Sequence, residues 1–186
     1  LARVKLTEKD FEGAIEDAQQ SAKLAEDLND PEAFQVWLAA GNIAIAADKP
    51  EIAISGWRKS LSLNPDQPLT ANNIAYILSV NMGEHQQALP LAEQAVAANP
   101  TNPTILDTLG SVQLALGDAQ AARQTLAQAI RRGAGAMTHV RYAMALVKDG
   151  DPQQAGSVLA SAKNRDDAEG DEFEAMVLEV ESILSP

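Results

Sequence analysis

Few residues in this sequence have the type and spacing that chemistry requires. No Cys is present, which excludes thiolate nucleophiles, disulfides and Cys-based zinc sites. The two His, His85 and His139, belong to no paired metal-binding motif, so we interpret both as structural or surface residues. Residues 133–135, Gly-Ala-Gly, begin like a nucleotide-binding loop, but Thr138 stands where the last Gly belongs, and we expect a turn between helices. We therefore predict no catalytic residue, no metal, no cofactor and no enzymatic activity.

Acidic residues are the most abundant charged groups, and they are concentrated at the two ends. The chain has 26 Asp and Glu against 14 Lys and Arg, a net charge of −12. Residues 1–34 carry a net −5 and residues 165–186 a net −7, while the residues between them are neutral overall. The acidic run at 166–172 lacks the alternating ligands of a calcium loop, and we interpret it as a solvated connection. The excess of acid argues against nucleic-acid binding, which needs Lys and Arg for phosphates.

The longest mainly apolar stretch, residues 36–47, contains Gly41 and Asn42 and is much shorter than the roughly 20 residues that span a bilayer. We therefore expect no membrane insertion. The chain begins with Leu1 rather than Met, which favours a fragment or a processed form. The compartment is left open between bacterial cytoplasm and periplasm.

The sequence contains an internal repeat with a period near 34 residues. Three positions recur as small residues in four successive units: Gly41, Ala75, Gly110 and Ala143; Ala53, Ala88, Ala122 and Ala155; Ser60, Ala95, Ala129 and Ala162. Each unit contains two apolar segments of about a dozen residues, separated by a polar break that contains Gly, Asp or Pro. No segment alternates with period 2, so the pattern predicts an all-α chain of paired helices.

The residues between these positions resemble the tetratricopeptide repeat (TPR). The matching segments are Trp37-x-x-Ala40-Gly41-x-x-Ala44 with Ala53-x-x-x-Trp57 and Pro65, then Ala71-x-x-Ile74-Ala75-x-x-Leu78 with Ala88-x-x-x-Ala92 and Pro100, then Leu106-x-x-Leu109-Gly110 with Ala122-x-x-x-Leu126, and the more degenerate His139-x-x-Tyr142-Ala143 with Ala155-x-x-x-Leu159. The second copy has one extra residue. The sequence within these segments resembles that of bacterial TPR proteins.

The resemblance implies a right-handed TPR superhelix, an α-solenoid of antiparallel helical hairpins, with eleven helices of which the first is truncated. We predict a TPR array over residues 1–164, made of a partial repeat at 1–30 and repeats at about 31–66, 67–101, 102–134 and 135–164. Within the first complete hairpin, Trp37 and Trp57 are expected to be core residues. Residues 165–186 form a linker and a C-terminal capping helix, because apolar side chains recur there at helical spacing: Phe173, Met176, Val177, Val180, Ile183 and Leu184.

In TPR proteins the first helix of each unit lines the concave face, and the resemblance implies the same here. The candidate groove residues are Gln35, Asn42, Asn72, Asn73, Tyr76, Thr104, Asp107, Thr108, Ser111 and Arg141. Asn side chains both donate and accept, which suits the backbone of an extended peptide. A familiar TPR subtype grips a chaperone tail carboxylate with Lys, Asn and Arg. Asn42 and Asn73 match its two Asn, but Leu38 and Thr108 occupy the basic positions, so we predict no carboxylate clamp.

The sequence therefore predicts a protein–protein interaction scaffold or adaptor that binds a peptide segment or helix of a partner protein in its concave groove. Two alternatives stay open: that the chain is a regulatory or targeting module of a larger enzyme or assembly, and that it is a self-assembling scaffold.

Overall fold

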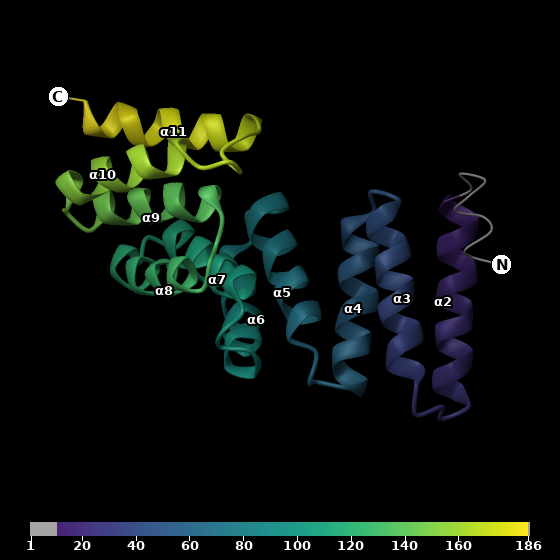
Figure 1. Cartoon of the computed structure of the whole chain (residues 1–186). Helices are drawn as coiled ribbons and strands as arrows, with labels where there is room; N and C mark the ends of the chain where they lie inside the picture. Colours follow the sequence, from purple (N-terminus) through teal and green to yellow (C-terminus); the bar gives the residue numbers. More distant parts are fainter. Residues whose placement is uncertain (1–10, 186) are drawn as a thin grey trace.

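Every regular element in the part of the chain that the structure describes, residues 11–185, is a helix (Figure 1). The structure is a computed structural model. Its helices are α2 (Phe11–Asp27), α3 (Ala33–Ala46), α4 (Pro50–Leu63), α5 (Pro68–Tyr76), the π-helix η1 (Ile77–Asn81), α6 (His85–Ala98), α7 (Pro103–Ala115), α8 (Ala119–Arg131), α9 (Ala136–Lys148), α10 (Pro152–Lys163) and α11 (Asp171–Leu184). The truncated first helix expected from the sequence lies outside the described residues.

Consecutive helices pack as hairpins, and the hairpins stack side by side. The hairpins pair α3 with α4, α5 with α6, α7 with α8, and α9 with α10, and α2 packs on α3 to a similar extent. The axis direction turns steadily along the stack: α2, α3 and α4 stand roughly upright in Figure 1, whereas α9, α10 and α11 run across the view. This progressive rotation is what curves a helical-repeat array into a superhelix. The unit boundaries stated above remain our proposal for dividing it.

The small residues of the repeat lie where paired helices approach most closely. Ala53, Ala88, Ala122 and Ala155 are all 0% exposed. Gly41 and Gly110 are buried as well, and a Cβ built on Gly41 would lie 2.5 Å from the indole nitrogen of Trp57. The equivalent Cβ on Gly110 would lie 2.5 Å from Cγ of Leu126. Glycine stands where the facing helix carries a large side chain, because only then can the two backbones keep their spacing.

The turns follow the local rules that the sequence indicated. Gly83, Gly117 and Gly150 have φ between 70 and 87°, and Asp48 takes the same left-handed position with φ 56°. Caps then open the next helices: the side chains of Asp118, Asp151 and Asn102 accept hydrogen bonds from backbone N–H groups in the first turns of α8, α10 and α7. The hairpin geometry is therefore encoded locally.

The extra residue of the second unit is absorbed by a π-turn. The spacing from the small residue of the first helix to the Ala of the second is 12 in three units, but it is 13 from Ala75 to Ala88. Within this interval α5 continues as η1, where Met82 N donates to Ile77 O at 3.2 Å, an i to i−5 hydrogen bond. One residue inserted into a helix without breaking it produces this wider turn.

The capping helix α11 closes the array by packing mainly on α9 and also contacting α10. Phe173, Val177 and Val180 are buried, and Met176 and Leu184 pack partly buried against the same core. The predicted apolar stripe is therefore covered except at Ile183, which is 48% exposed. No helix within residues 11–185 has the length and apolar character to span a bilayer.

Candidate functional site

The first helices of the first two complete hairpins, α3 and α5, present a surface without charge. Residues 33–47 and 67–83 contain no Asp, Glu, Lys or Arg. Large apolar side chains are nonetheless exposed on this surface: Leu69 is 56% exposed, Tyr76 40% and Ile45 37%. Uncharged and partly apolar accessible surface in an acidic protein is typical of a binding site.

Two neighbouring hollows lie on this surface, and we call them together the α3–α5 groove. The first, of about 580 Å³, is lined chiefly by Phe34, Gln35, Leu38, Ala39, Asn42, Gln67, Pro68, Leu69 and Thr70. The second, of about 420 Å³, is lined by Asn42, Ile45, Trp57, Asn73, Tyr76, Ile77 and Asn81. Asn42 belongs to both, so the hollows adjoin there.

A buried tryptophan fixes the orientation of Asn42. The indole N–H of Trp57, which is 2% exposed, donates to Oδ1 of Asn42 at 3.0 Å. An indole nitrogen can only donate, so the Asn42 oxygen must face Trp57. The amide NH₂ of Asn42, an exposed residue, is left to donate elsewhere. The prediction of a core Trp57 is confirmed. Trp37 is only half-buried and donates to Oε2 of Glu26 on α2 at 3.2 Å, so its core assignment is corrected.

The ten groove residues expected from the sequence separate into distinct places. Gln35, Asn42, Asn73, Tyr76 and Thr104 are exposed, and all of these except Thr104 line the α3–α5 groove. Ser111 and Asp107 are half-buried on α7. The expectation that every candidate faces the groove is corrected for Asn72, Thr108 and Arg141, which are only 4%, 5% and 8% exposed.

The physical reason is that these three positions point between helices rather than outward. Thr108 turns its hydroxyl back to the Thr104 carbonyl of its own helix at 3.2 Å. Of the residues that line the second hollow, the sequence analysis missed four: Ile45, Trp57, Ile77 and Asn81. Most residues that line the first hollow, such as Phe34 and Leu69, were not predicted either. Trp57 lies on the second helix of its hairpin, and Ile77 and Asn81 belong to η1, so a rule that takes fixed positions of first helices omits them. Ile77 lies four residues after the predicted Asn73, on the same helix face, and the extra residue of the second unit was the signal that could have found Asn81.

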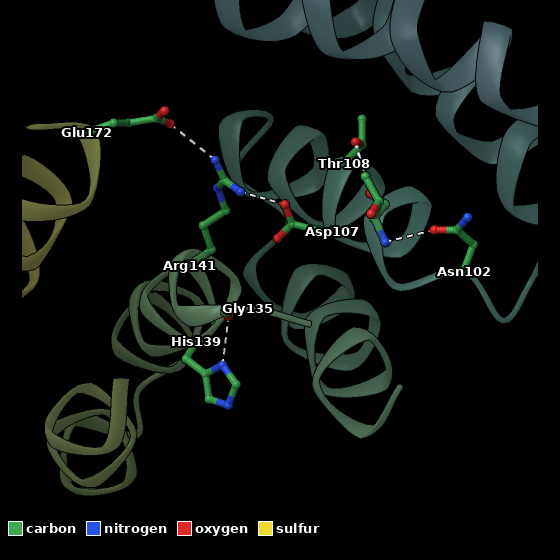
Figure 2. Close-up of polar contacts among 8 residues, drawn as sticks. Asn102, Asp107, Thr108, Gly135, His139, Arg141 and Glu172 are labelled. Atoms are coloured by element: carbon green, nitrogen blue, oxygen red, sulfur yellow. Dashed lines mark hydrogen bonds and ion pairs between the residues drawn. The ribbon is translucent and has the colours of Figure 1, made fainter. Parts of the chain in front are cut away.

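Arg141, Asp107 and Glu172 form an ion-pair network that joins three helices (Figure 2). Nη1 of Arg141 on α9 donates to Oδ2 of Asp107 on α7 at 2.5 Å, and Nη2 donates to Oε1 of Glu172 on α11 at 3.2 Å. Burial raises the pKa of Asp107, and the attraction of Arg141 opposes that rise only in part. Both partners of Arg141 lie within the chain, so the network connects the end of the array to its capping helix.

The acidic connection before α11 also has a structural part, beyond the solvation expected of it. Oδ2 of Asp167 accepts the backbone N–H of Ala136 at 2.9 Å, at the start of α9. Hydrogen bonds from Arg165 and from this N–H hold the pKa of Asp167 below its ordinary value. The linker therefore ties α11 to the N-terminus of α9.

Both histidines make local hydrogen bonds. Nδ1 of His85 lies 2.9 Å from Oγ of Ser79, beside η1, and Nδ1 of His139 lies 2.9 Å from the Gly135 carbonyl, as Figure 2 shows for the latter. Among residues 11–185, no group of three or more His, Asp or Glu is placed to hold a metal ion.

The stacked hairpins, the small-residue interfaces and the capping helix define the chain as an α-solenoid of helical repeats, a class that offers extended surfaces for binding other proteins. A family model described as tetratricopeptide repeat matches residues 80–145. No curated protein sequence matches the chain significantly.

Solved structures share the fold over almost the whole chain. The structure of MamA residues 41–end from Desulfovibrio magneticus RS-1 is 18% identical, with 100% of this chain and 93% of that chain covered and a TM-score of 0.69. YrrB, described as a TPR protein with an unusual peptide-binding site, is 16% identical (97% and 88% covered, TM-score 0.74). A tetratricopeptide repeat protein from Parabacteroides merdae ATCC 43184 is 15% identical (98% and 70% covered, TM-score 0.80).

The family model thus matches the central residues 80–145, and the fold of the whole chain is similar to that of solved tetratricopeptide repeat proteins. The all-α solenoid predicted from the repeat is confirmed. Such arrays are interaction scaffolds.

Proposed function

We propose that this chain binds a peptide segment or helix of a partner protein in the α3–α5 groove, as a scaffold or adaptor without catalytic activity. The observation that carries the proposal is the groove itself: two adjoining hollows bordered by exposed apolar side chains and by the side-chain amides of Asn42, Asn73 and Gln35. Apolar walls with a few placed polar groups are typical of binding clefts. YrrB, which shares the fold, is described as having a peptide-binding site.

The neutral groove determines what kind of contact would hold the segment. Among the residues that the structure describes, no charged side chain lines the second hollow, and only Asp66 lines the first. Binding should therefore depend on apolar contact and on amide hydrogen bonds more than on charge, and it should weaken little as salt increases. This property separates groove binding from attraction to the acidic ends, which salt would screen.

The test is selection of peptides from a random twelve-residue phage library on the immobilised chain, followed by affinity measurements in solution. Asn73→Asp replaces an amide donor by a charge on the groove wall, and we expect it to weaken binding at least tenfold, because an unmade hydrogen bond costs about 1–3 kcal/mol. The matched control is Gln128→Glu, which adds the same charge on α8, a helix that packs on α7 and α9.

Unchanged affinity in Asn73→Asp would place the binding site elsewhere. Light scattering over a range of concentrations separates the self-assembling alternative, since a strict monomer would exclude it. Both ends of the chain are acidic, with net charges of −5 and −7, and this like charge opposes end-to-end stacking of two copies.

A further inference from the structure

The π-helix η1 changes which side chains border the groove. An α-helix continuing from Tyr76 would present Val80, four residues later, on the same face. Ile77, four residues after Asn73, would lie on this face of a regular helix as well, but the wider turn of η1 brings Asn81 rather than Val80 into the lining of the second hollow, beside Tyr76. This turn is the place in the array where the repeat spacing is broken by one residue. A π-turn replaces regular helical hydrogen bonds, and such turns are found often at functional sites.

The opposite wall of this hollow is built from the first complete hairpin. Trp57 on α4 reaches past α3 because Gly41 has no side chain, and its indole lies where a Cβ on Gly41 would be. Trp57 and Tyr76 then contribute two aromatic side chains, and Ile45 and Ile77 contribute two branched apolar ones. Aromatic rings gain from packing on other rings beyond the area that they bury.

The polar side chains that line the hollow, besides the Tyr76 hydroxyl and the Trp57 indole N–H, are the amides of Asn42, Asn73 and Asn81. Asn42 is oriented as a donor by its hydrogen bond from Trp57 at 3.0 Å. A donor fixed at the edge of an apolar hollow matches the carbonyl of a chain whose side chain enters that hollow. Within residues 11–185 no charged side chain lines the hollow, although the protein carries a net −12. An ionised side chain entering it would lose its hydration without gaining a partner.

We propose that the hollow between α3, Trp57 and η1 is an anchor pocket for one aromatic side chain of an uncharged peptide segment, with Asn42 donating to the backbone carbonyl of that segment. The inference rests on the proposed function and names the class of segment that the groove takes. The π-turn is then the feature that makes this hairpin the specific one in an otherwise regular array.

The probes are the library peptides and one derived series. We expect the selected peptides to share an aromatic residue flanked by uncharged ones. In the strongest binder that residue is replaced in turn by Leu, Ala, Glu and Lys. Replacement by Ala should weaken binding at least tenfold, since burying a large apolar side chain contributes about 1.5–3 kcal/mol. Glu and Lys should bind no better than Ala. Selected peptides without a shared aromatic residue would overturn the anchor pocket.

Substitutions in the protein, rather than in the peptide, give a second test of the pocket. Deleting Val80 restores the regular spacing of 12 and should remove the aromatic preference. Because this deletion can affect folding, Tyr76→Ala and Ile45→Glu, both at exposed positions, are measured beside it with circular dichroism as the folding check. Each should abolish the distinction between the aromatic and the Ala peptide, while Gln128→Glu preserves it.

The outcomes distinguish this inference from the proposed function. If Asn73→Asp weakens binding but Tyr76→Ala and Ile45→Glu leave the aromatic preference intact, the groove stands and the anchor pocket is wrong. If no peptide is selected, or no groove variant changes affinity, both are wrong.

Discussion

Gly41→Ala is a sharp test of the packing that places Trp57 behind the groove. The added methyl group would lie 2.5 Å from Nε1 and 2.9 Å from Cγ of Trp57, whereas carbon atoms pack best at about 3.5–4.0 Å. The indole is rigid, buried and hydrogen-bonded to Asn42, so α3 and α4 must separate by about 1 Å. Overpacking of this kind costs about 1–3 kcal/mol.

Helix propensity acts in the opposite direction and supplies the control. Alanine stabilises a helix interior by about 1 kcal/mol relative to glycine, so propensity alone predicts a more stable variant. At Gly156 in α10 nothing lies within 4 Å of an added Cβ, and Gly156→Ala should show that gain alone. We expect Gly41→Ala to lose about 1–2 kcal/mol and to melt about 2–8 °C lower, and Gly156→Ala to melt about 2–4 °C higher.

Thermal unfolding followed by far-ultraviolet circular dichroism measures both variants. Tryptophan emission, recorded in parallel, reports the surroundings of Trp37 and Trp57, which both lie in the first complete hairpin, and shows whether this hairpin unfolds separately from the rest. A Gly41→Ala variant as stable as the unsubstituted chain would refute the close approach of α3 and α4, and with it the account of how Trp57 reaches the second hollow.

Three further predictions concern the rest of the array. Gly110→Ala should destabilise less than Gly41→Ala, because the facing Leu126 is flexible and can change rotamer; parallel thermal melts compare the two. Arg141→Met leaves Asp107 buried without its cation and should cost about 3–5 kcal/mol in urea unfolding, much of it recovered when Asp107→Leu is added. Because burial raises the pKa of Asp107, its contribution to stability is fully present below the ordinary Asp pKa and is lost as pH rises through the raised value. Urea midpoints between about pH 3 and pH 8 should show that part of the pH dependence removed in Asp107→Asn.

Two results would contradict the predictions for Arg141 and Asp107. An Arg141→Met variant of normal stability would show that the network adds nothing to the closing of the array. A pH profile of Asp107→Asn that runs parallel to that of the unsubstituted chain would show that Asp107 titrates alike in the folded and unfolded chain. Glu26 and Asp167, whose pKa values are lowered by hydrogen bonds, act in the opposite sense and lose their contribution as pH falls, so only the difference between the two profiles isolates Asp107.

The sequence by itself determined the helices, their pairing and the interior positions. Small residues spaced 12 or 13 apart within a hairpin lie at its closest approach, which is why Ala53, Ala88, Ala122 and Ala155 are fully buried. Gly and Asp in the breaks specify the turns, because a left-handed residue and a cap act within a few residues of themselves. These effects are local, and a local pattern that repeats along the chain can be recognised from the sequence alone.

Only the tertiary structure decided which polar residues reach the surface. Asn72 and Asn73 are neighbours in sequence, yet one is buried and the other lines the groove, because the angle between successive hairpins determines which side of a first helix is covered. Asp107, Arg141 and Glu172 meet across separations of 34 and 31 residues, which reflect the stacking of three units rather than any motif. The extra residue after Ala75 was visible in the sequence, but only the folded helix shows that a π-turn absorbs it beside Trp57 and Tyr76.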